Sequence, residues 1–201
     1  MRCVLQRDGL SGRSLRLGGA PWPRAIRRVF SDPTLVKKET KVTGRGTEEM
    51  KTNDVTNRFR AGSVGIGIEL GRPSVGSTFI DVQRMSRALA QRGIRFERRN
   101  PLTKLIDEHT GDIDESILPE RVLSAILEFV VPLDDLKEVL ETILATAETL
   151  NTVFSLDMIY LNDPETKKRA MEILADIGLP PSLAGKTNVG LGRRTNEGVT
   201  A

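Results

Sequence analysis

The feature that most constrains the fold is a strict alternation of apolar residues that leads into a glycine-bearing turn and then a helix-like run. Residues at every second position over 64–70 are apolar, which predicts a strand with one buried face. These residues are Val64, Ile66, Ile68 and Leu70. Gly65 and Gly67 fall on the opposite face, where the missing side chains let a helix, another backbone or a ligand approach closely.

The next segments predict a β-α-β unit. From residue 79 the apolar positions recur at helical spacing, with Ser77 or Thr78 available as the N-cap. Gly93 suits a left-handed C-cap with Ile94 beyond it, and residues 94–97 then suit a short second strand. Two strands joined by a helical crossover are expected to run parallel.

The rest of the chain predicts three helices and one strand. Residues 117–131 are apolar at most positions, which we interpret as a helix buried on several sides. Pro132 precedes an amphipathic helix over 133–150, and period two returns over 152–161. A last helix begins after Asp163, with Pro164 at its first position, and ends at Gly178.

The fold class predicted from this order, β-α-β-α-α-β-α, is α/β (or α+β). We expect a small, mostly parallel sheet of about three strands covered by about four helices. The domain prediction has three parts: a basic leader over 1–60, a globular domain over 61–180 and a C-terminal tail over 181–201.

The charge is divided unevenly along the chain. Residues 1–49 hold 11 Lys and Arg against 5 Asp and Glu, whereas the remaining residues are net acidic. The overall charge of +3 therefore belongs to the leader and gives no argument for nucleic-acid binding by the domain. Because two glutamate codons before Met50 can resemble a ribosome-binding site, we expect Met50 as the true start; a transit peptide, a disordered tail and a nucleic-acid-binding arm are the alternatives.

Residues 71–78, Gly-Arg-Pro-Ser-Val-Gly-Ser-Thr, are the first candidate site. A strand, a glycine turn and a helix start can hold a phosphate, because a helix N-terminus presents unpaired N–H groups. The predicted anion-binding residues are Gly71, Arg72, Gly76, Ser77 and Thr78. The structural alternative is a tight turn followed by an ordinary helix cap.

The same stretch resembles the first nucleotide-binding motif of small GTPases. In that motif a lysine stands where this chain has Ser77, and the base-reading Asn-Lys-x-Asp motif is missing here. The GTPase assignment therefore fails. Residues 185–187, Gly-Lys-Thr, follow a helix and lack the required earlier glycine, so we interpret them as a chance tripeptide.

Carboxylates form the second candidate site. If the strands that carry Glu69 and Asp157 are neighbours with coinciding faces, the two acids could act in acid/base chemistry; the alternative is that each points to solvent. His109 stands in an acidic run, which we interpret as a solvated loop before a helix. With one histidine and one cysteine, Cys3, the chain predicts no metal site, and the sequence names no cofactor.

The function predicted first is a small cytoplasmic, non-catalytic subunit or partner-binding module. Open sheet edges and apolar helical surface favour a homo-oligomer or a larger protein subunit as the partner. Nucleic acid is an unfavoured partner, and no apolar run approaches a membrane span. The alternative function is a domain, and possibly an enzyme, that binds a phosphometabolite or nucleotide through residues 71–78.

Overall fold

A computed structural model describes residues 20–32, 34–35, 58–161 and 163–183. The helices in this part of the chain are α1 (Ile26–Ser31), α2 (Phe79–Ala90), α3 (Leu133–Ala147) and α4 (Pro164–Asp176). The strands are β1 (Ser63–Leu70), β2 (Ser77–Thr78), β3 (Arg121–Val122), β4 (Ala125–Pro132) and β5 (Phe154–Ile159). Two single 3-10 turns, Thr103–Leu105 and Glu115–Ile117, lie between α2 and β3. None of the helices described is long and apolar enough to cross a membrane.

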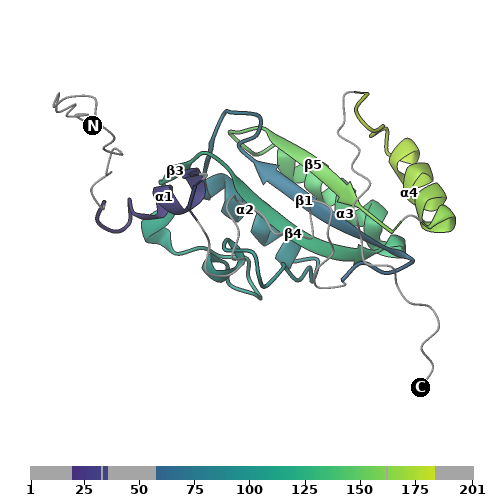
Figure 1. Cartoon of the computed structure of the whole chain (residues 1–201), viewed down its shortest axis with the longest axis horizontal. Coiled ribbons are helices and arrows are strands. Elements are labelled where there is room, and N and C mark those ends of the chain that lie inside the picture. Colours follow the sequence, from purple (N-terminus) through teal and green to yellow (C-terminus); the bar gives the residue numbers. More distant parts are fainter. Residues whose placement is uncertain (1–19, 33, 36–57, 162, 184–201) are drawn as a thin grey trace, which may run out of the picture.

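The main sheet has three strands in the order β4-β1-β5 (Figure 1). Both β4 and β5 pair with β1 in the antiparallel sense. The two outer strands therefore run parallel to each other, with α3 as the connection between them and β1 inserted in the middle. Figure 1 shows α2 and α3 on the same side of this sheet, with α4 beyond α3.

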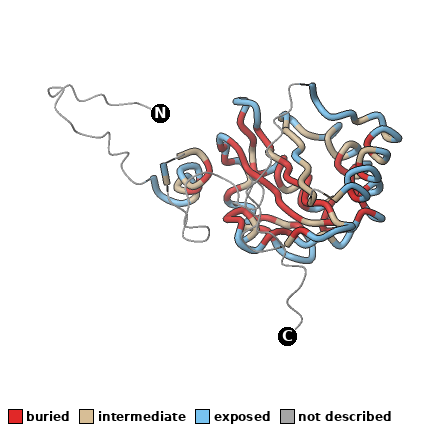
Figure 2. Tube along the Cα trace, turned by 45° about the vertical axis from the view of Figure 1, so that its right-hand side comes forward, coloured by how far each residue is buried: buried red, intermediate tan, exposed pale blue. Residues whose placement is uncertain are grey.

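One face of the sheet forms the core. All four apolar residues predicted for β1 are fully buried, and their partners on β4 continue the same face. Those partners are Val131, Phe129, Leu127 and Ala125. The buried residues form a continuous layer along the central strands and the inner helix faces (Figure 2). This burial supplies the main driving force for the fold.

The predicted parallel α/β arrangement is wrong. In the described part of the chain the sheets are antiparallel and no parallel pair of neighbouring strands occurs. The predicted helix over 117–131 instead contains the last residue of a 3-10 turn, β3, and all of β4 except Pro132. Residues 94–97, predicted as the second strand, contribute a single bridge between Phe96 and Phe129. The partners of β1 are thus β4 and β5, and both pair with it in the antiparallel sense.

The helix ends predicted from N-cap residues and C-terminal glycines are confirmed. Thr78 is the N-cap of α2, and its hydroxyl oxygen accepts from Asp81 N. Asp163 caps α4 in the same way, with Pro164 at the first position. Gly93 and Gly178 have left-handed φ angles of 75° and 69°. The next residue after each glycine then donates its N–H back into the helix, as in a Schellman motif.

Helix α1 packs on the small sheet formed by β2 and β3. Phe30 is 1% exposed and meets Phe79 edge to face, with ring centroids 5.6 Å apart. Ser31 Oγ accepts from Leu123 N at 3.0 Å, and the partly exposed Arg27 pairs with the buried Glu120. Residues 26–31, which the sequence prediction placed in the leader, are thus in contact with the rest of the fold. Cys3, Met50 and residues 185–187 lie outside the described residues.

Candidate functional site

The loop 71–76 folds back on itself through its two glycines. Gly71 and Gly76 have φ angles of 89° and 78°, which favour glycine. Gly71 O accepts from the N–H groups of Val75 and Gly76, both at 3.0 Å. Gly71 N donates to Val153 O at 2.8 Å, so the loop is fastened to the start of β5.

The N–H groups at the start of α2 are occupied by protein acceptors. Phe79 N donates to Glu120 O at 3.3 Å, and Ile80 N donates to Leu118 O at 3.1 Å. Asp81 N donates to the Thr78 hydroxyl. A helix N-terminus binds an anion with such N–H groups, and here the segment before β3 and the N-cap already use them.

The carboxylate of Asp81 supplies the negative charge at this helix end. Asp81 is buried, accepts from Thr78 Oγ1 at 2.9 Å and from Asn151 N at 3.0 Å, and pairs with Arg84. A carboxylate in the first turn is favoured by the helix dipole. Asp81 was not among the residues predicted for the site, although its position three residues after a threonine cap was the available signal.

The five predicted anion-binding residues therefore have other contacts in this structure. Arg72 Nε pairs with Glu69 Oε2 at 3.0 Å. The buried Ser77 hydroxyl donates to Thr78 O at 3.1 Å, and Thr78 caps α2. Together with the two turn glycines, these contacts describe a tight turn and a cap. Anion binding by residues 71–78 stays a prediction.

Glu69 and Asp157 lie on neighbouring strands and on the same sheet face. In the β1–β5 register Glu69 is opposite Ser155, and Asp157 is opposite Gly67. The two acids are thus diagonal neighbours, and the face they share is the one opposite the core. Glu69 accepts from Ser155 Oγ at 3.3 Å in addition to its pairing with Arg72. An acid/base role for the pair stays a prediction.

A buried polar cluster closes the outer edge of β4. Glu97 N donates to Glu128 O at 2.7 Å, and Asn100 Nδ2 donates to Ile126 O at 3.0 Å and to Glu128 Oε2 at 2.6 Å. Glu97 also pairs with Arg58. This cluster was not predicted from the sequence. Its signal was Glu128, a charged residue inside the apolar run 125–131.

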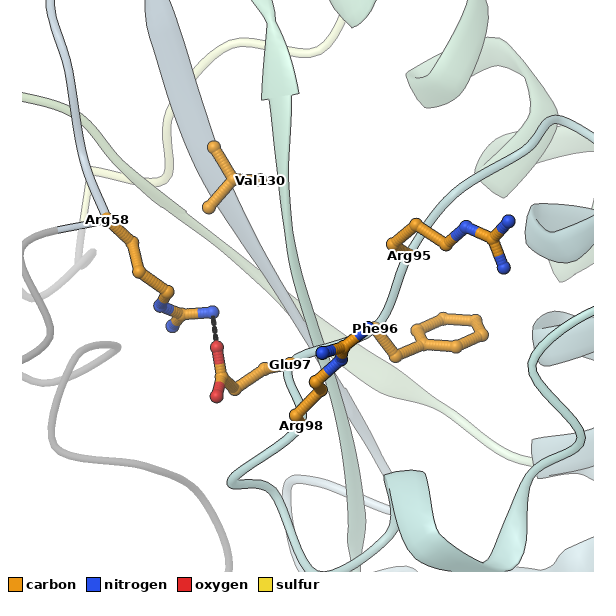
Figure 3. A pocket seen from close by; sticks show the side chains of 6 residues that line it. All are labelled: Arg58, Arg95, Phe96, Glu97, Arg98 and Val130. Carbon is orange, nitrogen blue, oxygen red and sulfur yellow. Dashed lines mark ion pairs between the residues drawn. The ribbon is translucent and has the colours of Figure 1, made fainter.

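A shallow hollow of about 350 Å³ lies beside the same cluster (Figure 3). Its lining residues are Arg58, Arg95, Phe96, Glu97, Arg98 and Val130. Figure 3 shows Arg58 directed toward Glu97, whereas Arg95 extends away from that pair. Arg95 contacts Glu108, through both its carboxylate and its carbonyl oxygen at 3.2 Å. Arg98 lies 3.9 Å from the same carboxylate oxygen of Glu108, so Arg58 pairs with one carboxylate of the chain and the other two arginines with another.

The acidic loop over 107–115 is organised by hydrogen bonds from its own backbone. Asp107 Oδ1 accepts from the N–H groups of Thr110 and His109 and from the Thr110 hydroxyl, and these bonds lower the pKa of Asp107. Asp114 caps the following 3-10 turn through Ser116, whose hydroxyl and N–H lower its pKa. No cluster of metal-ligating side chains occurs among the residues that the structure describes.

The outer edge of β5 differs from the outer edge of β4. Because Val153 O points to β1, the alternation of a strand directs the backbone groups of Ser155, Asp157 and Ile159 to β1 as well. Phe154, Leu156 and Met158 then present their N–H and C=O groups outward. Within the described residues β5 pairs only with β1. The same alternation on β4 turns Ile126 and Glu128 outward, where their carbonyls have the partners named above.

Apolar side chains are exposed on three segments that approach one another around Gly71, after the end of β1. Gly71 is bonded to Val153, and Thr152 Oγ1 donates to Gly76 O at 2.7 Å. A Cβ at Gly71 would lie 2.9 Å from Leu123 O, so the segment before β4 also approaches here. Each segment exposes one apolar residue: Val75 is 53% exposed, Leu123 41% and Val153 46%. We call these three residues the Val75 cluster.

No protein-family model, no curated protein and no solved structure matches the chain.

Proposed function

We propose that this chain is a small non-catalytic module that binds a protein partner through the outer edge of β5. The observation that carries the proposal is the contrast between the two edges of the main sheet. Glu97 and Asn100 donate to two outward carbonyls of β4, those of Glu128 and Ile126, whereas β5 has no second strand in the described part of the chain. Outward N–H and C=O groups on an edge strand are a template for an added strand.

The composition of β5 supports the same proposal. Edge strands that avoid pairing usually carry lysine, proline or a bulge, but β5 reads Phe-Ser-Leu-Asp-Met-Ile with one charge. Its side chains are only partly buried, apart from the exposed Asp157. Val153, which is 46% exposed, adds one apolar residue just before the start of the strand. Backbone pairing would give affinity, and these side chains would give selectivity.

A matched pair of variants at Met158 tests the proposal. Both Met158→Ala and Met158→Pro shorten the side chain, but only proline removes the outward N–H. We expect the full chain to form an assembly, detected by native mass spectrometry, that the alanine variant keeps and the proline variant weakens at least tenfold. A monomeric wild-type chain, or an assembly that both variants keep, would contradict the proposal.

A second measurement covers the case in which the proline variant does not fold. Amide hydrogen exchange of the wild-type chain compares Leu156 and Met158 in the assembly with the same residues after dilution. We expect protection of these two amides to require the assembly, while Ser155 and Asp157 stay protected in both. Equal protection of all four amides in the dissociated chain would contradict an open edge.

A further inference from the structure

We infer that the strand added at the β5 edge is β5 of a second copy of this chain, antiparallel about a two-fold axis at Leu156. This inference rests on the proposed function and names its partner. Two copies related by a two-fold axis must use the same surface on both sides. The edge of β5 meets this requirement because its pattern matches itself when reversed.

The geometry of antiparallel pairing limits the possible registers. Opposed residues share a sheet face and share the direction of their backbone groups. The outward residues Phe154, Leu156 and Met158 must therefore pair with one another. With Leu156 at the axis, Phe154 lies opposite Met158 of the second copy, and Ser155 lies opposite Asp157.

These registers differ in the residue that lies opposite Asp157. An axis at Asp157 would place two carboxylates directly opposite each other, which is destabilising. Axes at Ser155 and Met158 would place Asp157 opposite Val153 and Ile159, respectively. The axis at Leu156 gives each Asp157 a serine hydroxyl as its neighbour and places the exposed Val153 opposite Ile159.

The resulting assembly is a continuous six-stranded antiparallel sheet in the order β4-β1-β5-β5-β1-β4. A two-fold axis perpendicular to the sheet keeps both pairs of α2 and α3 on one side. Its two ends are the β4 edges, where Glu97 and Asn100 already bond to the carbonyls of Glu128 and Ile126. The pairing therefore closes at two copies and does not continue into a fibre.

A disulfide between two differently tagged full chains tests the register. In a Cys3→Ser background, one chain carries Ser155→Cys and the other Asp157→Cys, and the two are co-expressed. In the inferred register these positions form a pair without backbone hydrogen bonds, with Cα atoms about 4.5 Å apart. That separation lies within the range that a disulfide spans. We expect most of the oxidised protein to be the mixed dimer.

Each single variant is the matched control. Alone, Ser155→Cys or Asp157→Cys places two cysteines diagonally, so a disulfide dimer is expected in a minor fraction only. A predominant disulfide in the Asp157→Cys chain alone would move the axis to residue 157 and overturn the inferred register. An assembly with a different protein, lost in Met158→Pro but kept in Met158→Ala, would overturn the second copy while supporting the proposed function.

Circular dichroism of the cysteine variants checks that they fold. We expect them to fold because both positions lie on the non-core face of β5.

Hydrogen exchange measured at several concentrations of the wild-type chain tests the inference without any substitution. Protection at Leu156 and Met158 that rises with the concentration of pure chain supports the second copy. Protection that does not change with concentration overturns it.

Discussion

The ring of Phe59 lies over the α-carbon of Gly65 on the sheet face opposite the core. A Cβ at residue 65 would come within 2.2 Å of Phe59 Cε1, closer than real Cβ atoms approach any neighbour. Phe59 is buried although its own segment lies outside the strands. The glycine predicted to permit a close approach thus accommodates an aromatic ring of the same chain.

Substituting Gly65 by alanine is expected to lower the free energy of unfolding by about 1–3 kcal/mol, because the added methyl group displaces Phe59. In a Phe59→Ala background the same substitution is expected to be neutral or to stabilise by up to about 1 kcal/mol, since alanine is better than glycine in a strand. Urea unfolding of the four chains measures the difference. Equal destabilisation in both backgrounds would show that the two residues are not coupled.

Replacement of Phe30 by alanine is expected to cost about 3–5 kcal/mol, because its ring is buried against Phe79. A chain that begins at Met50 lacks all of α1 and is expected to be destabilised at least as much. Thermal or urea unfolding of the full chain and of residues 50–201 measures this. A truncated chain as stable as the full one would favour Met50 as the start of the folded unit.

Trp22→Ala is the control for that series. Its side chain is 56% exposed and makes one hydrogen bond, from Nε1 to Ser116 Oγ at 3.1 Å. We expect a change of about 0.5 kcal/mol or less. A large effect would mean that the region as a whole, not the buried ring, determines the stability.

The pKa of Asp107 is expected to lie below that of an unperturbed aspartate, because the N–H groups of Thr110 and His109 donate to its carboxylate. Since the pKa is lower in the folded chain than in the unfolded one, the stabilisation is present above the unfolded pKa. It is lost as the pH falls through the folded pKa. NMR titration of the Asp107 carboxyl carbon measures the pKa directly.

Asp107→Asn keeps an acceptor at the same position but cannot titrate. The acid limb of the stability curve should therefore be shallower in this variant than in the wild type. An identical limb in the two chains would exclude Asp107 as a contributor to acid unfolding.

Inorganic phosphate is expected to leave the amide resonances of Gly76 to Ile80 unshifted. The N–H groups of Gly76, Phe79, Ile80 and Asp81 already have protein acceptors, and the charge of Asp81 opposes a second anion. NMR titration of the full chain measures this. A saturable shift that disappears in Arg72→Ala and Ser77→Ala would instead establish the anion site predicted from the sequence.

Features that depend on residues close together in the sequence were predicted correctly. The alternation over 64–70, the caps at Thr78 and Asp163 and the glycine stops at Gly93 and Gly178 are all present in the structure. Each depends on residues within a few positions of one another. The strand β5 and the helices α2, α3 and α4 were identified for the same reason.

The pairing of strands could not be predicted in the same way. Strand β4 is buried on both faces, so the polar alternation that marks a strand is absent and the run resembles a buried helix. Its content of Ile126, Phe129, Val130 and Val131 favoured a strand. Because the residues of β4 were interpreted as a helix, the short run 94–97 was predicted to be the strand beside β1. The predicted parallel crossover between these two strands was therefore wrong.

Only part of the candidate site could be predicted from the sequence. The neighbouring strands of Glu69 and Asp157 were considered, but the occupied N–H groups at α2 depend on Leu118 and Glu120, far along the chain. The closed edge of β4 depends likewise on Glu97 and Asn100. Which hydrogen-bonding groups remain open is a property of the tertiary structure.

The central position of β1 has a consequence for synthesis on the ribosome. It is the first strand of the main sheet to be made, yet both of its partners come from the second half of the chain. The nascent chain therefore carries an apolar strand with two open edges until β4 and then β5 emerge. The long-range pairing also implies slow folding for a chain of this size. A chaperone that shields residues 63–70 during translation would have the longest time to act on this part of the protein.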